Sequence, residues 1–278
     1  MGGETLMTVL ARCVTSASRS VVEGALAVVS ENPASWPPQL TAYVTWRLQC
    51  QADLLTQPGV HFVVARERRL RVWRFVIPLW VMVFNDTAVV STAPELAPSV
   101  EKLLRGAAVG DLLDDRAVGS LRALILKWGP LDWFRRAFWL YCTKDTFTPR
   151  LVAEVVPVPP DHPESQALRE RHRGEVFGVF RGRELVSRSS IKTESDAAWE
   201  VAVATVERHR RQGLGAGVVS RATEFILAQG KVALYHCEAD NEASRRLAES
   251  LGYRLLARDL AWSVEATSVP WLWRERTF

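Results

Sequence analysis

The chain has 278 residues, of which 48% are apolar and 24% charged, a balance typical of a folded globular protein. Such a chain can bury a large core without disulfide or metal staples. The net charge of +4 is small and the bases form no stripe, which argues against a nucleic-acid binder.

The four cysteines are scattered without a CxxC pair, and the five histidines show no ligand spacing. We therefore expect no disulfide framework and no metal site. The start of the chain lacks a basic segment followed by an apolar run, so we expect no signal peptide. The longest apolar run, FVIPLWVMVF, is too short to span a bilayer and contains Pro78. These features predict a cytoplasmic protein without a membrane partner.

The first part of the chain is predicted to mix helices and strands. The apolar spacing predicts a helix over 5–29, strands over 61–93 and amphipathic helices over 93–107 and 115–129. FVIPLWVMVF is expected to form one long strand or a strand pair, with a turn after it at Asn85 and Asp86.

The segment Phe134–Trp139, FRRAFW, allows two interpretations, a core helix with exposed arginines or an amphipathic membrane contact. The helix is the simpler of the two. The proline-rich stretch Pro157–Pro163 is typical of a linker. We therefore predict two domains, an N-terminal α/β domain over 1–150 and a second domain over 151–278.

The second part has a clearer pattern. We expect, in order, a strand at 151–158, a helix at 163–174, strands at 175–180, 184–192 and 199–205, a helix at 216–230, a strand at 232–238, a helix at 241–252 and a final strand or strand pair at 253–265. Three successive strands favour an antiparallel meander, and the later strand–helix–strand unit favours one parallel crossover. The predicted fold class is α/β (α+β), a mixed, mostly antiparallel sheet flanked by helices.

The segment VERHRRQGLGAG, Val206–Gly217, carries the densest chemical signal. It joins a predicted strand to a predicted helix, where free backbone N–H groups and the helix dipole favour an anion. Glycines let a phosphate approach the backbone, and arginines add attraction. The GxGxG spacing matches neither the GxxxxGK[ST] loop of nucleoside-triphosphate binders nor the GxGxxG dinucleotide fingerprint.

The stretch Arg210–Ala216 fits the pattern R-x-x-G-x-G/A, and a second pattern follows at Asn241-x-x-Ser244-x-x-Leu247 and Leu251-Gly252-Tyr253. With these two motifs, residues 150–265 resemble the GNAT acetyltransferase superfamily. The resemblance implies acetyl-CoA as cosubstrate and a GNAT-like fold. The first part would then be a degenerate copy of the same fold or a domain that shapes the acceptor site.

The resemblance also implies roles for individual residues. The loop would bind pyrophosphate, the end of the preceding strand would pair with the pantetheine arm, and the next crossover would touch the cofactor. The residues concerned are Arg210, Arg211, Gln212, Gly213, Leu214, Gly215 and Ala216 in the loop, Val203, Ala204 and Thr205 in the strand, and Asn241 and Ser244 in the crossover. The backbone N–H of Val203 or a neighbour would face the thioester oxygen.

Ala248 stands where many family members have a tyrosine that protonates the departing thiolate. Ser244 lies one helical turn earlier and could relay a proton. Attack on a thioester requires a neutral amine, so a base must accept a proton. Glu200 is the first candidate base, Glu238 the second and His236 the third, each weighed against an exposed acid or a satisfied core histidine.

We thus expect an N-acyltransferase that moves an acetyl group from acetyl-CoA directly to a primary amine on an unidentified small molecule or protein. The alternative is a non-catalytic acyl-CoA-binding module, because of Ala248. A nucleoside-triphosphate binder is a third interpretation. Trp262, Trp271 and Trp273 could mark a homodimer surface, although a packed terminal strand accounts for them more simply.

Overall fold

The computed structural model describes residues 30–70 and 75–265 of the chain. Within these ranges a single mixed sheet runs through the molecule, with its strands in the order β1-β3-β2-β10-β4-β9-β8-β7-β6-β5. The bounds are β1 (Gly59–Val64), β2 (Phe75–Phe84), β3 (Thr87–Thr92), β4 (Leu131–Cys142), β5 (Val156–Pro157), β6 (Arg173–Arg181), β7 (Glu184–Lys192), β8 (Ala198–Thr205), β9 (Val232–Glu238) and β10 (Arg254–Glu265).

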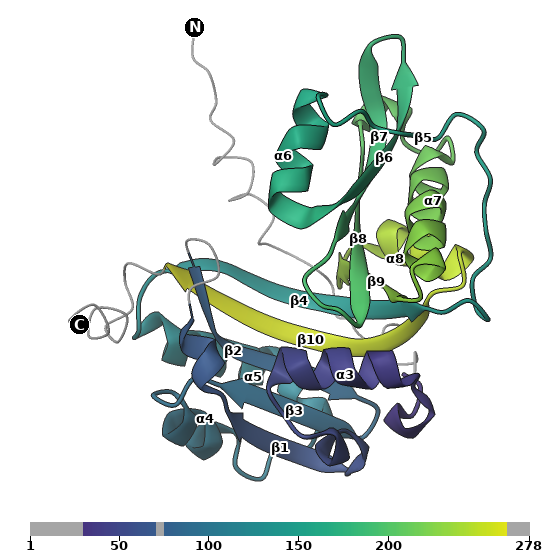
Figure 1. The fold of residues 1–278 in the computed structure, drawn as a ribbon. Coiled ribbons are helices and arrows are strands. Elements are labelled where there is room, and N and C mark those ends of the chain that lie inside the picture. The colour runs from purple at the N-terminus through teal and green to yellow at the C-terminus, as the bar shows by residue number, and fades with distance from the viewer. Residues whose placement is uncertain (1–29, 71–74, 266–278) are drawn as a thin grey trace, which may run out of the picture.

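Helices lie on both faces of this sheet (Figure 1). Their bounds are α3 (Pro38–Leu48), α4 (Ala97–Leu104), α5 (Asp115–Leu126), α6 (Pro163–His172), α7 (Leu214–Ala228) and α8 (Glu242–Ser250). A short 3-10 turn, η5 (Glu207–His209), stands between β8 and α7. Helices α3, α4 and α6 have proline in their first two positions, where its missing N–H costs no hydrogen bond.

The alternation of side chains along β4 separates the two faces. Trp139 and Tyr141 pack with residues of α3, whereas Phe138 and Leu140 pack with residues of α7 and α8. We call these sides the α3 face and the α7 face. The α7 face continues into the first part of the chain, where β2, β3 and β10 pack against α4 and α5.

Two long strands, β4 and β10, link the N-terminal and C-terminal elements (Figure 1). Strand β4 pairs with β9 on one side and with β10 on the other, and β10 also pairs with β2. The sheet therefore runs without interruption across residue 150, where the sequence predicts a domain boundary. The division into 1–150 and 151–278 stays a prediction.

Most of the elements predicted for the second part are confirmed, with small shifts at their ends. Strands β6, β7 and β8 form an antiparallel meander, and β8 pairs with β9 in parallel across the α7 crossover. The hairpin between β6 and β7 turns at Gly182, whose φ of +61° favours glycine. Trp262 is fully buried in the last described strand, so the packed-strand prediction is confirmed for it.

Two predictions are wrong. The segment 134–139 belongs to strand β4, not to a core helix. Its arginines point to opposite faces and find distant acids, Arg135 pairing with Asp259 and Arg136 with Asp115. The strand expected at 151–158 is reduced to Val156–Pro157.

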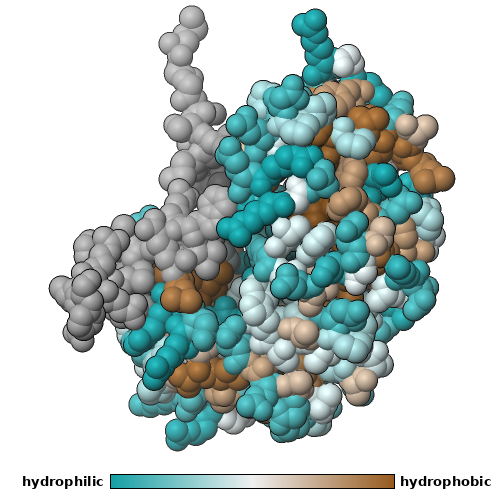
Figure 2. Space-filling view, in the orientation of Figure 1, coloured by the Kyte–Doolittle hydropathy of each residue, from teal (hydrophilic) through white to brown (hydrophobic). Residues whose placement is uncertain are grey.

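The predicted helix at 5–29 and two tryptophans, Trp271 and Trp273, lie outside the described residues. Among the residues that the structure does describe, no helix is both long enough and apolar enough to cross a membrane. On the face drawn in Figure 2 the hydrophobic surface is divided into separate patches by hydrophilic residues.

Candidate functional site

The glycine loop lies between the end of β8 and the first turn of α7. Gly213 caps the helix with a φ of +79°, and Arg211 before it also has a left-handed backbone with a φ of +61°. Gly217 N donates to Gly213 O at 3.1 Å, the first bond of the helix. The N–H groups of 214–216 precede this bond, so the helix itself offers them no acceptor. These N–H groups and the helix dipole favour an anion, and the binding of one here stays a prediction.

The three glycines of the loop serve different purposes. Gly213 supplies the left-handed turn, in a position with open space around it. A Cβ on Gly215 would lie 3.2 Å from Leu247 Cδ1 and 3.4 Å from Thr205 Oγ1, so the helix passes close to both. A Cβ on Gly217 would lie 2.6 Å from Val152 Cγ2, which explains this glycine by packing alone.

The bases of the loop also differ. Arg208 forms an ion pair with Glu184 of the β6–β7 hairpin and is therefore already neutralised. Arg210 is exposed, and its Nε donates to Thr205 O at 3.3 Å. Arg211 and Gln212 are exposed beside the cap of α7. The charge available to a bound anion is thus that of Arg210 and Arg211.

Strands β8 and β9 separate just where the loop approaches. Their parallel register ends at Val201 and Tyr235, although both strands continue for several residues. On its other edge β8 stays paired with β7, and Val206 N donates to Val186 O at 2.9 Å.

Hydrogen bonds in an antiparallel pair alternate, and this fixes the direction of the remaining N–H groups. Residues 204, 202 and 200 point theirs toward β7. The N–H groups of Val203 and Thr205 then point toward the side of β9, beyond the last paired residue. This open strand edge ends at the N-terminus of α7, so an extended chain could pair with β8 while its anionic end meets the helix. Ala204, between Val203 and Thr205 on this strand, is exposed.

Asn241 and Ser244 lie at the start of α8. The side chain of Asn241 caps the helix by accepting from Ser244 N at 3.1 Å. The Ser244 hydroxyl lies 2.8 Å from the hydroxyl of Tyr235, which burial keeps protonated by raising its pKa to about 12. Ala248 is fully buried one turn later. Sequence reasoning missed Tyr235, although the alternation of β9 places it on the face that α8 covers.

Glu200 is 8% exposed near the start of β8, on the α3 face. Lys192, its cross-strand neighbour on β7, lies 2.5 Å from its carboxylate. Burial alone would raise the pKa of Glu200, but the charge of Lys192, with smaller contributions from His236 and Arg47, lowers it to about 2. A carboxylate of so low a pKa is a weak base.

Glu238 and His236 lie on β9, beyond the last residue that pairs with β8. Burial and the charge of Asp259 raise the pKa of Glu238, while Arg135 opposes them. Burial lowers the pKa of His236 to about 4, so this imidazole is neutral at physiological pH. Its ring lies 4.9 Å from the ring of Trp139, between centroids.

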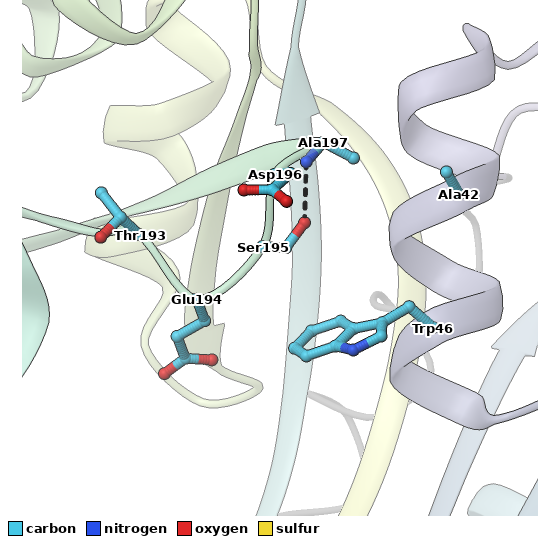
Figure 3. Close-up of a pocket in the computed structure, with 7 residues that line it drawn as sticks. All are labelled: Ala42, Trp46, Thr193, Glu194, Ser195, Asp196 and Ala197. Carbon is cyan, nitrogen blue, oxygen red and sulfur yellow. Dashed lines mark hydrogen bonds between the residues drawn. The ribbon is translucent and has the colours of Figure 1, made fainter.

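A surface pocket of about 340 Å³ opens between α3 and the loop from β7 to β8. Trp46 and Glu194 project into it from opposite walls, and Ala42 lies on α3 next to Trp46 along the helix (Figure 3). Ser195 shapes the loop by accepting from Ala197 N at 3.0 Å. Arg47 connects the pocket to the buried residues, since it pairs with Glu194 at 3.1 Å and lies over the ring of Trp139.

Residues 170–258 match a family model described as GNAT acetyltransferase. The chain therefore contains a GNAT domain over this segment of its C-terminal part. A search of curated proteins gives no match.

Several solved structures match parts of the chain. A putative acetyltransferase of the GNAT family from Novosphingobium aromaticivorans has 22% identity over 49% of this chain and 67% of its own, with a TM-score of 0.42. A GCN5-related N-acetyltransferase from Kribbella flavida has 19% identity over 71% of this chain and 91% of its own, with a TM-score of 0.41. A GNAT family acetyltransferase from Elizabethkingia anophelis, solved with acetyl-CoA bound, has 13% identity over 44% of this chain and 99% of its own, with a TM-score of 0.32.

Proposed function

We propose that the protein transfers an acetyl group from acetyl-CoA directly to a primary amine. The observation that carries the proposal is the open edge of β8, which ends at the free N–H groups of α7. A pantetheine arm can pair with such an edge while a pyrophosphate binds the helix N-terminus. The family match over 170–258 supports acyl transfer as the general chemistry.

Residues of the loop, of β8 and of α8 would each bind a different part of the cosubstrate. The N–H groups of Leu214, Gly215 and Ala216, after the turn at Gly213, would bind the pyrophosphate, with Arg210, Arg211 and Gln212 around it. Val203 and Thr205 would pair with the amides of the arm. The N–H of Val203 would stabilise the charge that develops on the thioester oxygen. Asn241 would hold the start of α8 against the arm.

The reaction needs one bond to form and one to break. The amine nitrogen attacks the thioester carbon, a C–N bond forms, and the C–S bond breaks. We assign proton removal from the amine to Glu238, because burial raises its pKa toward that of a useful base, whereas Lys192 makes Glu200 a weak one. The Ser244 hydroxyl, hydrogen-bonded to Tyr235, or water returns a proton to the thiolate.

A matched pair of glycine variants tests the binding site. Gly213→Ala and Gly182→Ala both place a side chain on a left-handed backbone with open space around it, so both carry a similar strain of about 1 kcal/mol. Only Gly213→Ala should weaken the stabilisation of the protein by CoA in a thermal-shift assay, by about tenfold in affinity. Equal CoA affinity in both variants would contradict the proposed site.

The same preparation tests the reaction. Acetyl-CoA and a panel of primary amines are added to the protein, and free thiol is followed with time. Thiol release that depends on the amine supports the transferase. CoA binding without release on any amine would favour the second candidate, a non-catalytic acyl-CoA-binding module, which the buried Ala248 favours. Stabilisation by ATP and not by CoA would indicate a nucleoside-triphosphate binder instead.

A further inference from the structure

Two carboxylates flank a small residue in the middle of the sheet. Glu238 on β9 is in register with Ala137 on β4, and Ala137 is in register with Asp259 on β10. All three side chains lie on the α3 face. Ala137, the residue between the two acids, carries only a methyl group. Glu238 is exposed and Ala137 and Asp259 are buried, so the row leads from the surface at Glu238 into the core at Asp259.

The two oxygens of Asp259 have unequal surroundings. The side chain is fully buried, and Oδ2 accepts three hydrogen bonds, from Trp80 Nε1, Trp139 Nε1 and Arg135, each at 2.9 Å. Oδ1 is also buried but has no hydrogen-bond partner within 30–70 and 75–265. A buried carboxylate oxygen without a donor is costly, so it indicates that a further donor belongs there.

Two other side chains complete the cluster, which we define as Arg135, His236, Glu238 and Asp259. Burial has the largest effect on the pKa values of His236 and Glu238. The charge of Asp259 acts to raise each of these two pKa values, and the charge of Arg135 acts to lower each of them. The four groups therefore share one electrostatic environment. Like Asp259, His236 has a buried atom, Nε2, that finds no partner in the described part of the chain.

The charge and the position of the cluster both suit one cation. Two carboxylates and one guanidinium leave a net charge of −1, because the buried His236 is neutral. The cluster is on the α3 face, and it borders the segment of β9 that no longer pairs with β8. The N-terminus of α7 lies on the other face. A donor bound on the α7 face and an acceptor bound on the α3 face could therefore meet at the gap between β8 and β9.

We propose that this cluster binds the amine of the acceptor, with Asp259 Oδ1 and Glu238 accepting its N–H groups. Asp259 is then a positioning residue that fixes the nitrogen for attack. The inference rests on the proposed acetyl transfer and deepens it, because it defines the acceptor as a compound that presents a protonated amine to a buried carboxylate. Proton loss to Glu238 makes that amine nucleophilic.

Asp259→Asn tests the inference because the amide keeps an oxygen for the two indoles but loses the charge. We expect the KM for the amine to rise at least tenfold, with an unchanged affinity for CoA. Ser263→Ala is the matched control, since Ser263 is fully buried on the same strand and face and its hydroxyl also has no partner among the described residues. This control should leave the KM unchanged.

A second variant and a second readout keep the test decisive if Asp259→Asn does not fold. Ala137→Val places a larger side chain between the carboxylates without changing a charge, and it should raise the KM in the same way. Binding is also measured without turnover, by the tryptophan emission of CoA-saturated protein titrated with methylamine, glycinamide and a lysine-containing peptide. Trp80 and Trp139 bond to Asp259 directly, so at least one of these probes should change the wild-type emission.

The failures of the two proposals can be told apart. Absence of CoA binding and of thiol release would refute the transferase. Turnover with an unchanged amine KM in every folded variant at Asp259 and Ala137 would overturn the amine site and leave the transferase intact. Wild-type emission that responds to none of the three probes would also overturn the amine site.

Discussion

The carboxylates of Glu200 and Glu238 lie on neighbouring strands, on the same face, and yet have opposite surroundings. Burial acts on both and raises their pKa values. For Glu200 the ammonium of Lys192 at 2.5 Å outweighs burial, whereas for Glu238 the nearby Asp259 reinforces it. Identical side chains thus acquire different basicity from their neighbours across the sheet.

His236 should make the folded state sensitive to mild acid. Its pKa is about 4 when folded and about 6.5 in the free side chain, so the unfolded chain binds more protons between these values. The contribution to stability is complete above about pH 6.5 and falls as the pH drops toward 4. We expect the melting temperature of the wild type to decline across this range, and that of His236→Gln to decline less.

The measurement is a series of thermal melts from pH 7 to pH 4. His172, with a folded pKa also near 4, contributes to the same slope, so a single variant removes only part of it. His209→Gln, in the loop outside the core, serves as the control. Parallel pH profiles for wild type and His236→Gln would refute the assignment.

At the scale of single elements, the turn after α8 is held by a close backbone contact. Gly252 has a φ of +85°, and a Cβ there would lie 1.8 Å from Thr146 O. Thr148 N donates to Leu251 O at 3.0 Å across the same contact. The glycine of the second motif is therefore required by packing between α8 and the segment after β4.

Gly252→Ala should destabilise the protein by more than about 3 kcal/mol, because backbone strain and a clash with a carbonyl add together. Gly230→Ala at the end of α7 is the matched control. It has a similar φ of +71° with open space around it and should cost only about 1 kcal/mol. Urea unfolding of both variants measures the difference, and equal losses would contradict the role of Thr146.

The elements after residue 160 could be predicted from the sequence because their signals are local. Short runs rich in apolar and β-branched residues indicate β6 to β9, Gly182 marks the hairpin, and Asn241 caps α8. The prediction of a helix at 134–139, where the structure has β4, was wrong for a non-local reason. Arg135 in this strand is paired with Asp259, which neutralises it, and the two residues are far apart in the chain.

The same distinction applies to the site. The loop Arg210–Ala216 lies in one stretch of sequence, so its motif could be found before the structure was known. The Tyr235–Ser244 hydroxyl pair and the cluster around Ala137 depend on strand register and helix packing. No short pattern in the sequence specifies which residues meet across β4, β9 and β10.

At the scale of the whole molecule, the sheet makes the two parts of the chain interdependent. A fragment of residues 151–278 would contain β9 without its neighbour β4, and β10 without β2 or β4. We expect this fragment to lack a cooperative unfolding transition, because two strands would expose apolar faces and unpaired edges. Near-ultraviolet circular dichroism and urea unfolding of the isolated fragment check this.

A fragment that starts at residue 131 is the control. It includes β4 and restores the pairing with β9 and one edge of β10. It should regain part of the cooperative transition, although β10 still lacks β2. A sharp transition in the shorter fragment would show that the boundary near residue 150 separates two independent folding units after all.

The central position of β4 in the sheet also affects folding during synthesis of the chain. A ribosome releases β4 well before β9 and β10, the two strands that will enclose it. During that interval its apolar residues and both of its edges have no native neighbours, and the nascent chain is a target for chaperones and for aggregation. A pause in translation after β4 has left the ribosome and before β9 and β10 have emerged would lengthen this exposure, whereas a pause after β10 has emerged would not.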